Sequence, residues 1–152
     1  MKTIIILSDT HHNFSALEKL LPKMEENDYV FHLGDNESDI MQYRKELGSK
    51  IYSVAGNCDG GGEDLVLEVE GLKILLTHGD RYGVKNSLYK LLLRAKEIGA
   101  NLVFYGHTHI SMIEKIDGIT FINPGCTTNY IENSYCYAVL HQGKITAKIV
   151  TF

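Results

Sequence analysis

Residues 2–12 read KTIIILSDTHH and set the pattern that the rest of the chain repeats. The β-branched run from Lys2 to Leu7 predicts a buried strand. The run ends abruptly in the polar residues Ser8 to His12, several of which can bind a metal or a proton. A buried strand that delivers such a loop is typical of a functional site at the end of a sheet.

A one-sided helix is predicted directly after this loop. Its apolar residues keep a three-and-four spacing and are Phe14, Leu17, Leu20, Leu21 and Met24. Asn13 is expected to cap the first turn of this helix. Pro22 is expected to end or bend it early, because proline lacks the N–H that a helix interior uses.

The order of strand, loop and helix then repeats. Residues 29–33 predict a second strand, residues 34–38 a loop and residues 39–47 a second helix. A third strand at residues 50–54 leads into the loop that holds Asn57. This alternation favours parallel strands joined by crossover helices.

The second half of the chain combines one helix with many strands. Residues 65–70 and 73–77 predict a hairpin, and residues 84–98 predict a helix closed by Gly99. Further strands are expected at residues 102–105, 112–115, 119–122, 136–140 and 144–150, with turns at Asp117-Gly118 and Gln142-Gly143. We therefore expect an α/β fold in which two sheets lie between helices.

Length and composition fit one soluble domain over residues 1–152. The chain has 44% hydrophobic and 22% charged residues, and its formal net charge of −4 argues against a general nucleic-acid-binding surface. The first apolar run is too short for a signal peptide or a membrane span, so we expect a cytoplasmic protein without a membrane partner. Three cysteines without a C-x-x-C spacing indicate reduced thiols.

Metal-capable side chains follow five of the predicted strands. They are Asp9, His11, Asp35, Asn57, His78, His107 and His109. Because strand ends converge at one edge of an open sheet, these loops can meet in one crevice. Seven ligands are too many for one divalent ion and suit two ions that share a carboxylate. The ligand types fit manganese, which we expect, and also zinc, nickel or iron.

The same stretches resemble the calcineurin-like metallophosphoesterase superfamily, in particular its small bacterial and archaeal phosphodiesterase branch. The resemblance covers residues 3–125 and includes Asn123-Pro124-Gly125. The motifs that carry it are Asp9-Thr10-His11, Gly34-Asp35, Gly56-Asn57-Cys58-Asp59, Thr77-His78-Gly79-Asp80 and Gly106-His107-Thr108-His109. The resemblance implies a four-layer α/β/β/α sandwich of two mixed sheets flanked by helices.

The resemblance also implies a role for each predicted ligand. Asp9, His11 and His109 would bind one metal, and Asn57, His78 and His107 would bind the other. Asp35 would bridge both ions, and Asn57 and His107 would stabilise the charged transition state. The implied reaction is in-line attack on a phosphodiester by a hydroxide that bridges two divalent metals.

Two positions depart from the pattern of the superfamily. Cys58 stands where its protein phosphatases have a histidine that helps to protonate the leaving group. His12 stands where glycine is common, and could act as a replacement acid. As a cysteine nucleophile would need an activating base, we expect Cys58 and Cys126 to be small packing residues.

Several neighbouring residues allow two interpretations. Asp59 and Asp80 could orient ligands or be surface turn acids, and Arg81 could clamp a phosphate or be salt-bridged. His32 is expected to be structural. The substrate pocket is expected to include Glu63, Tyr82 and residues 127–134.

Three other functions remain open. A phosphomonoesterase or a cyclic-nucleotide phosphodiesterase would use the same residues. A protein-sorting scaffold is a third alternative from the same superfamily, but the resemblance implies that its branch has lost some of the metal-binding side chains that this chain retains. An exposed edge in the final strands would permit a homo-oligomer.

Overall fold

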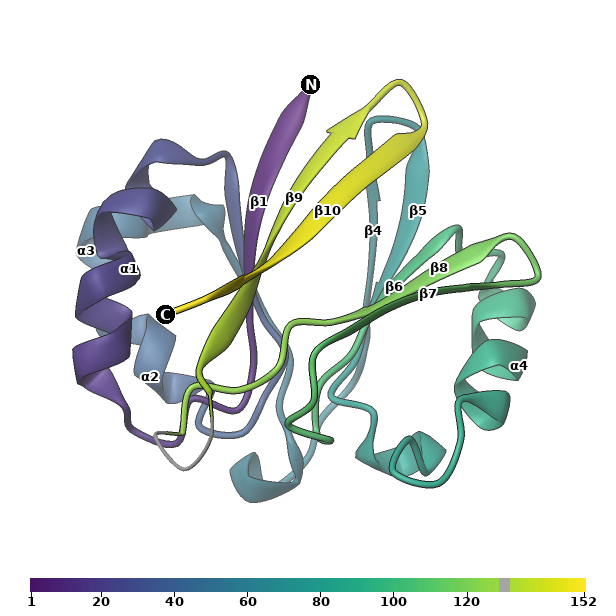
Figure 1. Ribbon diagram of the computed structural model, residues 1–152, viewed down its shortest axis with the longest axis horizontal. Coiled ribbons are helices and arrows are strands. Elements are labelled where there is room, and N and C mark those ends of the chain that lie inside the picture. Colours follow the sequence, from purple (N-terminus) through teal and green to yellow (C-terminus); the bar gives the residue numbers. More distant parts are fainter. Residues whose placement is uncertain (129–131) are drawn as a thin grey trace.

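The computed structural model describes residues 1–128 and 132–152 and has four layers (Figure 1). Three helices cover one face of a first five-stranded sheet, a second five-stranded sheet packs on its other face, and one helix covers the outer face of the second sheet. The predicted four-layer α/β/β/α sandwich of two mixed sheets is therefore confirmed.

The first sheet has the strand order β10-β9-β1-β2-β3. Strands β1, β2 and β3 run parallel, whereas β9 and β10 add an antiparallel hairpin at the other side. The bounds are β1 Lys2–Leu7, β2 Tyr29–His32, β3 Ile51–Ser53, β9 Ser134–His141 and β10 Lys144–Thr151. The parallel strands are those that the alternation of strands and helices predicts.

The second sheet has the order β4-β5-β6-β8-β7. Strands β5, β6 and β8 are parallel, and β4 and β7 pair with them as antiparallel edge strands. The bounds are β4 Leu65–Val69, β5 Leu72–Leu76, β6 Leu102–Phe104, β7 Met112–Ile116 and β8 Ile119–Asn123. The three hairpin turns each place two successive residues at positive φ, as in Asp117 (51°) and Gly118 (79°), which suits the twist of antiparallel strands.

The main core lies between the two sheets. Phe31 of the first sheet meets Phe104 of the second edge-to-face, with ring centroids 5.8 Å apart. Because β1 is buried on both faces, Ile4 and Ile6 join this core while Ile5 and Leu7 pack against α1 and its neighbours. A third cluster packs α4 on the second sheet. This arrangement fixes both sheets against each other and brings their strand ends together.

Helix α1 (Phe14–Glu26) begins where the sequence predicts, because the side chain of Asn13 accepts a hydrogen bond from the Ala16 N–H at 3.3 Å. Pro22 does not end the helix early, since the helix continues to Glu26. Pro22 is exposed, so water can reach the carbonyl that loses its helical partner, and Met24 beyond it is fully buried.

Two other helix predictions are corrected. The segment 39–47 forms two short helices, α2 (Ser38–Met41) and α3 (Arg44–Leu47). Helix α4 (Tyr89–Ile98) begins five residues later than position 84, after a series of turns in which Ser87 Oγ accepts from the Tyr89 N–H. Gly99 closes α4 in a left-handed conformation as predicted. Among the described residues, no helix is long and apolar enough to cross a membrane.

Candidate metal centre

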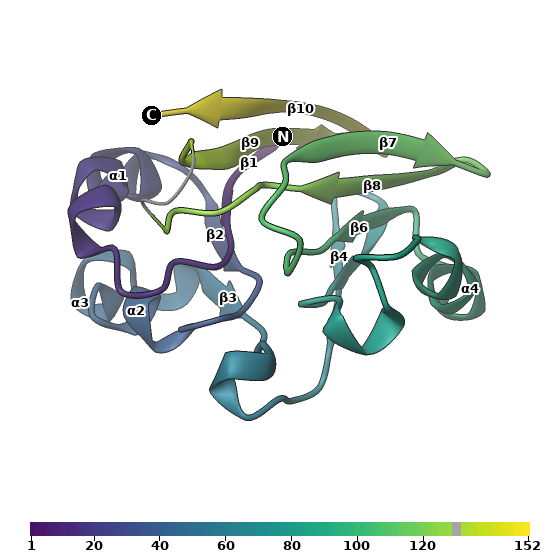
Figure 2. The same cartoon turned by 60° about the horizontal axis from the view of Figure 1, so that its bottom comes forward.

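The predicted ligand loops meet at one edge of the molecule. Strands β1, β2 and β3 of the first sheet and β5 and β6 of the second all end there, and each continues into a loop with at least one predicted ligand. Figure 2, which turns this edge forward, shows the loops of the two sheets facing each other. The centre is thus shared between the sheets.

One group of side chains contains Asp9, His11, Asp35 and His109, whose ligand atoms lie within 4.8 Å of one another. His109 Nε2 lies 3.2 Å from Asp9 Oδ1, and His11 Nε2 lies 3.7 Å from Asp35 Oδ2. Two ligands of one ion, each about 2.0–2.2 Å from it, lie about 3–4.4 Å apart. These distances fit a divalent cation between the side chains.

A second group contains Asp35, His78 and His107. His78 Nε2 lies 3.5 Å from Asp35 Oδ1 and 3.1 Å from His107 Nδ1. Asp35 belongs to both groups, with Oδ2 toward His11 and Oδ1 toward His78. A carboxylate placed in this way can bridge two ions.

Two buried polar atoms support a cation in this position. Within the described part of the chain, Asp9 Oδ1 and His11 Nε2 are buried and have no hydrogen-bond partner. The His109 nitrogen at 3.2 Å from Asp9 Oδ1 is close enough for an ion pair but does not form a hydrogen bond with it. Unpaired buried polar atoms are costly unless an ion or water satisfies them, so the residues present fit a metal.

A hydrogen bond of His78 shows which ring nitrogen carries the proton when the ring is neutral. Its Nδ1–H donates to the carbonyl of Leu33 at 2.7 Å, because a carbonyl can only accept. When the ring is neutral, Nε2 carries a lone pair on the side that faces Asp35 and His107. This is the tautomer in which an imidazole binds a metal while a backbone group orients it.

The electrostatics of these side chains favour positive charge at the site. Burial alone would raise the pKa of Asp35, but the protonated form of His78 and the Cys58 N–H outweigh burial and hold the pKa well below its usual range. Burial also lowers the pKa of His78, but nearby Asp35 and Asp9 raise it overall. Asp9 raises the pKa of His109 as well, whereas burial lowers that of His107.

The backbone of these loops is unusual. Left-handed φ values occur at seven residues of the site that are not glycine: Asp9, His11, His12, Asp35, Asn36, His107 and His109. Such conformations are disfavoured for side-chain-bearing residues and cluster at functional sites. Glycines provide the close approach between loops, since a Cβ on Gly106 would lie 2.0 Å from Ser8 Oγ. The unusual backbone conformation of the loops therefore places the predicted ligands close together.

Asn57 is the exposed member of the predicted set. It begins the short helical turn η2 (Asn57–Asp59), next to Cys58, whose N–H donates to Asp35 Oδ1 at 2.9 Å. The expectation that Cys58 is a packing residue is wrong, because this turn leaves it exposed, whereas Cys126 is buried. Slight desolvation of its thiol and the charge of nearby Asp35 raise the pKa of Cys58, which disfavours a thiolate nucleophile.

The structure decides between alternatives for two charged neighbours. Asp59 accepts from the N–H groups of Asn36 (2.8 Å) and Gly56 (2.9 Å), so it ties two ligand loops together. Arg81 Nη2 pairs with Asp64 at 2.6 Å, and the Tyr82 hydroxyl donates to the same carboxylate. Arg81 is thus salt-bridged rather than aimed at the centre. Of residues 127–134, positions 129–131 lie outside the described residues.

A buried chain of hydrogen bonds supports the His11 loop. The sequence predicted a structural role for His32 but did not predict the rest of this chain. The Gly34 N–H donates to His32 Nδ1, so His32 Nε2–H donates to Thr10 Oγ at 3.0 Å. Thr10 donates to Asp39 Oδ2, and His12 Nδ1–H donates to Asp39 Oδ1, both at 2.7 Å. His12 is thereby held in place at the mouth of the site with 64% of its side chain exposed.

Asn123 has a similar supporting role for the other histidine loop. Its Nδ2 donates to the Gly106 carbonyl at 3.1 Å and to Thr108 Oγ at 3.0 Å. The motif Asn123-Pro124-Gly125 pointed to this residue, whereas no sequence pattern pointed to Asp39.

Comparison with known proteins agrees with this geometry. A family model described as the calcineurin-like phosphoesterase superfamily domain matches residues 1–144. A probable metallophosphoesterase of Bacillus subtilis, YsnB, is 36% identical over 126 residues, which cover 80% of this chain and 73% of that protein. The phosphodiesterase MJ0936 of Methanocaldococcus jannaschii is 27% identical over 146 residues, covering 83% and 84% of the two chains.

Solved structures show the same relationship. A predicted phosphoesterase of Streptococcus pneumoniae superposes with a TM-score of 0.81 at 30% identity, covering 99% of this chain and 89% of that one. Vps29 from Entamoeba histolytica superposes with a TM-score of 0.78 over 99% of both chains. At 17% identity, the likeness to Vps29 is one of fold alone.

Proposed function

The chain belongs to the calcineurin-like phosphoesterase superfamily, and from this premise we propose that it is a phosphodiesterase that depends on two divalent metal ions. The observation that carries the proposal is the position of Asp35, which belongs to both groups of metal-capable side chains. Relatives named as phosphodiesterases, MJ0936 and YfcE of Escherichia coli, support the diester as substrate.

The proposed ligand set follows the two groups. Asp9, His11 and His109 hold one ion, His78, His107 and Asn57 hold the other, and Asp35 bridges them. Asn57 supplies an amide oxygen from the exposed turn beside Asp35. Oxygen and imidazole ligands without thiolate suit manganese, with zinc, nickel or iron as alternatives.

The proposed reaction is in-line displacement of an alcohol from a phosphodiester by hydroxide. When bound, the ions would supply positive charge for the phosphate and lower the pKa of the attacking water. The water oxygen forms a bond to phosphorus while the bond from phosphorus to the leaving oxygen breaks, and the leaving oxygen takes up a proton. In this proposal His107 and Asn57 would stabilise the charge that develops in the transition state. The role of His12 as the proton donor stays a prediction.

Two alternative activities would use the same centre, on phosphomonoesters or cyclic nucleotides. A non-catalytic scaffold is the alternative of another class. The buried unpaired atoms of Asp9 and His11 favour a metal-loaded centre over a scaffold, because a scaffold gains nothing from keeping them.

Hydrolysis by metal-stripped protein, titrated with Mn, Zn or Ni, tests the proposal. Bis-p-nitrophenyl phosphate is compared with p-nitrophenyl phosphate in the wild type, in Asp35→Asn and in Asp117→Asn. Asp117 lies in a hairpin turn and pairs with Lys96, so its variant is the matched control for loss of a carboxylate. We expect metal-dependent diester turnover in the wild type and the control, and at least a 100-fold loss in Asp35→Asn.

The other outcomes separate the alternatives. Preference for the monoester would indicate a phosphatase. If the protein binds no metal at all, the non-catalytic scaffold is the remaining alternative and the proposal is wrong.

A further inference from the structure

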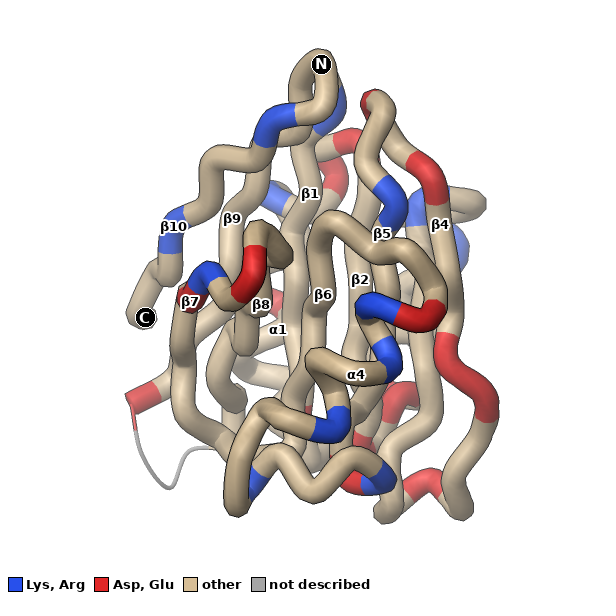
Figure 3. The backbone as a smooth tube through the Cα atoms, turned by 90° about the vertical axis from the view of Figure 1, so that its right-hand side faces the viewer, with Lys and Arg blue, Asp and Glu red and all other residues tan. Residues whose placement is uncertain are grey.

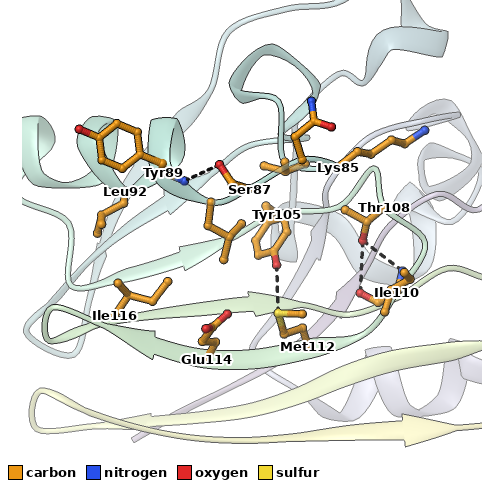
Figure 4. Close-up of a pocket in the computed structure, with 13 residues that line it drawn as sticks. Lys85, Ser87, Tyr89, Leu92, Tyr105, Thr108, Ile110, Met112, Glu114 and Ile116 are labelled. Atoms are coloured by element: carbon orange, nitrogen blue, oxygen red, sulfur yellow. Dashed lines mark hydrogen bonds between the residues drawn. The ribbon is translucent and has the colours of Figure 1, made fainter.

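A cavity of about 770 Å³ opens beside the metal centre, between the turns that precede α4 and strand β7 (Figure 4). Its walls are mainly apolar and include Leu88, Leu92, Tyr105, Ile110, Met112 and Ile116. Ligand sites in proteins are clefts of about 300–1,000 Å³ with mostly apolar walls and few polar groups. The cavity therefore has the size and lining of a binding site for a small molecule.

The cavity adjoins the metal centre through one wall. Thr108, which stands between the predicted ligands His107 and His109, lines it. The Thr108 hydroxyl oxygen accepts from the Ile110 N–H at 3.2 Å and from Asn123 Nδ2 at 3.0 Å, so this wall is held in place. A molecule in the cavity therefore lies next to the loop that carries two of the ligands.

Lys85 stands at the same end of the cavity. In Figure 4 its side chain lies on the side of Thr108, away from Tyr89 and Ile116. Lys85 and Thr108 line the same cavity, so the lysine lies on the side of the cavity next to the loop of His107 and His109. Figure 3 shows that Lys and Arg also occur along α4 and the segment leading into it. The positive charge of Lys85 favours an anionic group at this end of the cavity.

The rest of the cavity offers little to a charged ligand. The Tyr105 hydroxyl is directed at Met112 Sδ, 3.7 Å away, and burial together with Glu114 raises the pKa of Tyr105 to about 12. Tyr105 and Met112 are thus uncharged at physiological pH. Among the lining residues, Glu114 is the one acid, and its charge would repel a second phosphate.

We propose that this cavity holds an uncharged and largely apolar ester group of the substrate, with the phosphate at the metal centre and Lys85 between them. The proposal rests on the proposed function and names the class of phosphodiester that the site prefers: one with an aryl or alkyl group rather than a second charged group.

Kinetics with two esters of the same leaving group test the proposal. Methyl p-nitrophenyl phosphate and benzyl p-nitrophenyl phosphate both release p-nitrophenol, so they differ in the group that is retained. We expect kcat/KM for the benzyl ester to exceed that for the methyl ester by about tenfold or more, because burying a phenyl group is favourable.

Met112→Asp should remove this preference by placing a charge in the cavity. Ile113→Asp is the matched control, because neighbouring residues of a strand point to opposite faces. Both side chains are partly exposed, at 41% for Met112 and 46% for Ile113, so both variants should fold. We expect Ile113→Asp to retain the wild-type preference and the wild-type rate with the methyl ester.

A binding measurement on metal-free protein gives an independent readout. The methyl group of Met112 can be followed by NMR in protein labelled at the methionine methyl groups. Benzyl methyl phosphate should shift the Met112 signal, whereas dimethyl phosphate should not, and the buried Met24 should stay unchanged with both.

The outcomes distinguish this proposal from the proposed function. If the methyl ester is hydrolysed with metal but the benzyl ester shows neither a preference nor a Met112 shift, the cavity proposal is overturned and the phosphodiesterase stands. If neither ester is hydrolysed although Met112 shifts, the cavity binds the ester and the proposed function is wrong.

Discussion

At the scale of single residues, Gly56 shows how closely the ligand loops approach each other. A Cβ at this position would lie 2.3 Å from Asp35 Oδ1 and 2.5 Å from the Asp35 backbone nitrogen. Gly56→Ala must therefore displace Asp35. We expect it to lower the free energy of unfolding by about 1–3 kcal/mol, measured by urea titration, and to weaken manganese binding in calorimetry.

Gly62→Ala is the control for this substitution. A Cβ there would meet the Ala55 methyl group at 3.1 Å and no atom of the metal centre. Wild-type metal affinity is expected in this variant. If Gly56→Ala also bound manganese normally, Asp35 would not be held as tightly as the structure indicates.

His32 leads to a prediction of how the free energy of unfolding depends on pH. Burial lowers its pKa from 6.5 to about 4, and its two ring nitrogens are engaged with Gly34 and Thr10. The folded protein therefore binds a proton here less readily than the unfolded chain, for which the pKa is about 6.5. The contribution of neutral His32 to stability is complete above pH 6.5 and is lost as the pH falls toward 4.

We expect this single group to remove roughly 1–2 kcal/mol of unfolding free energy between pH 6.5 and pH 5 in metal-free protein. Other histidines contribute their own slopes, so the comparison is with His32→Asn. The difference between the two pH profiles isolates His32, and parallel profiles would contradict the assignment.

At the scale of elements, α1 contains a proline that it tolerates at a cost. Pro22 is exposed and removes one backbone hydrogen bond from the helix. We expect Pro22→Ala to raise the free energy of unfolding by about 1–3 kcal/mol, which thermal denaturation would show as a higher Tm. Lys23→Ala, an exposed neighbour, should change stability by less than about 0.5 kcal/mol.

The elements that the sequence predicted well are those with a strong period or an end signal. The β-branched run of β1, the cap at Asn13 and the stop at Gly99 each depend on neighbouring residues, so local patterns suffice. The break between α2 and α3 and the late start of α4 were not predictable in this way. They follow from turns and from tertiary contacts, such as the bonds that Asp39 makes to Thr10 and His12.

The same distinction applies to the site. The predicted ligands each follow a strand, and parallel strands bring their ends to one edge, so the sequence placed them near each other. Asp39 and the cavity beside Thr108 escaped prediction, because they depend on side chains from distant segments that share no periodic pattern.

At the scale of the whole molecule, the candidate metal centre lies between the two sheets. Asp9, His11 and Asp35 come from the first sheet, and the histidines His78 and His107 come from the second. Ions that bind only the folded state should raise its stability, by about 2.7 kcal/mol for one site at a metal concentration 100 times the Kd. Calorimetric scans with and without manganese should show a higher Tm that Asp35→Asn removes.

Protons should compete with the metals for this centre. The pKa of His78 is raised by Asp35 and Asp9 despite burial, and Asp9 raises that of His109. Both imidazoles must be neutral to bind a metal, so manganese affinity should increase with pH through the neutral range. Titration calorimetry in buffers of different ionisation enthalpy should detect proton release on binding. Equal affinity at pH 6 and pH 8 would contradict this expectation.

The hydrogen bond from the His107 N–H to Asp9 Oδ2 joins residues that are 98 positions apart in the chain. Contacts of this kind form late in folding, because a long loop must close first. A growing or partly folded chain would carry separate histidines and carboxylates but no centre. Loading with metal would then mark completion of the fold, and an ion could stabilise the finished protein without guiding its assembly.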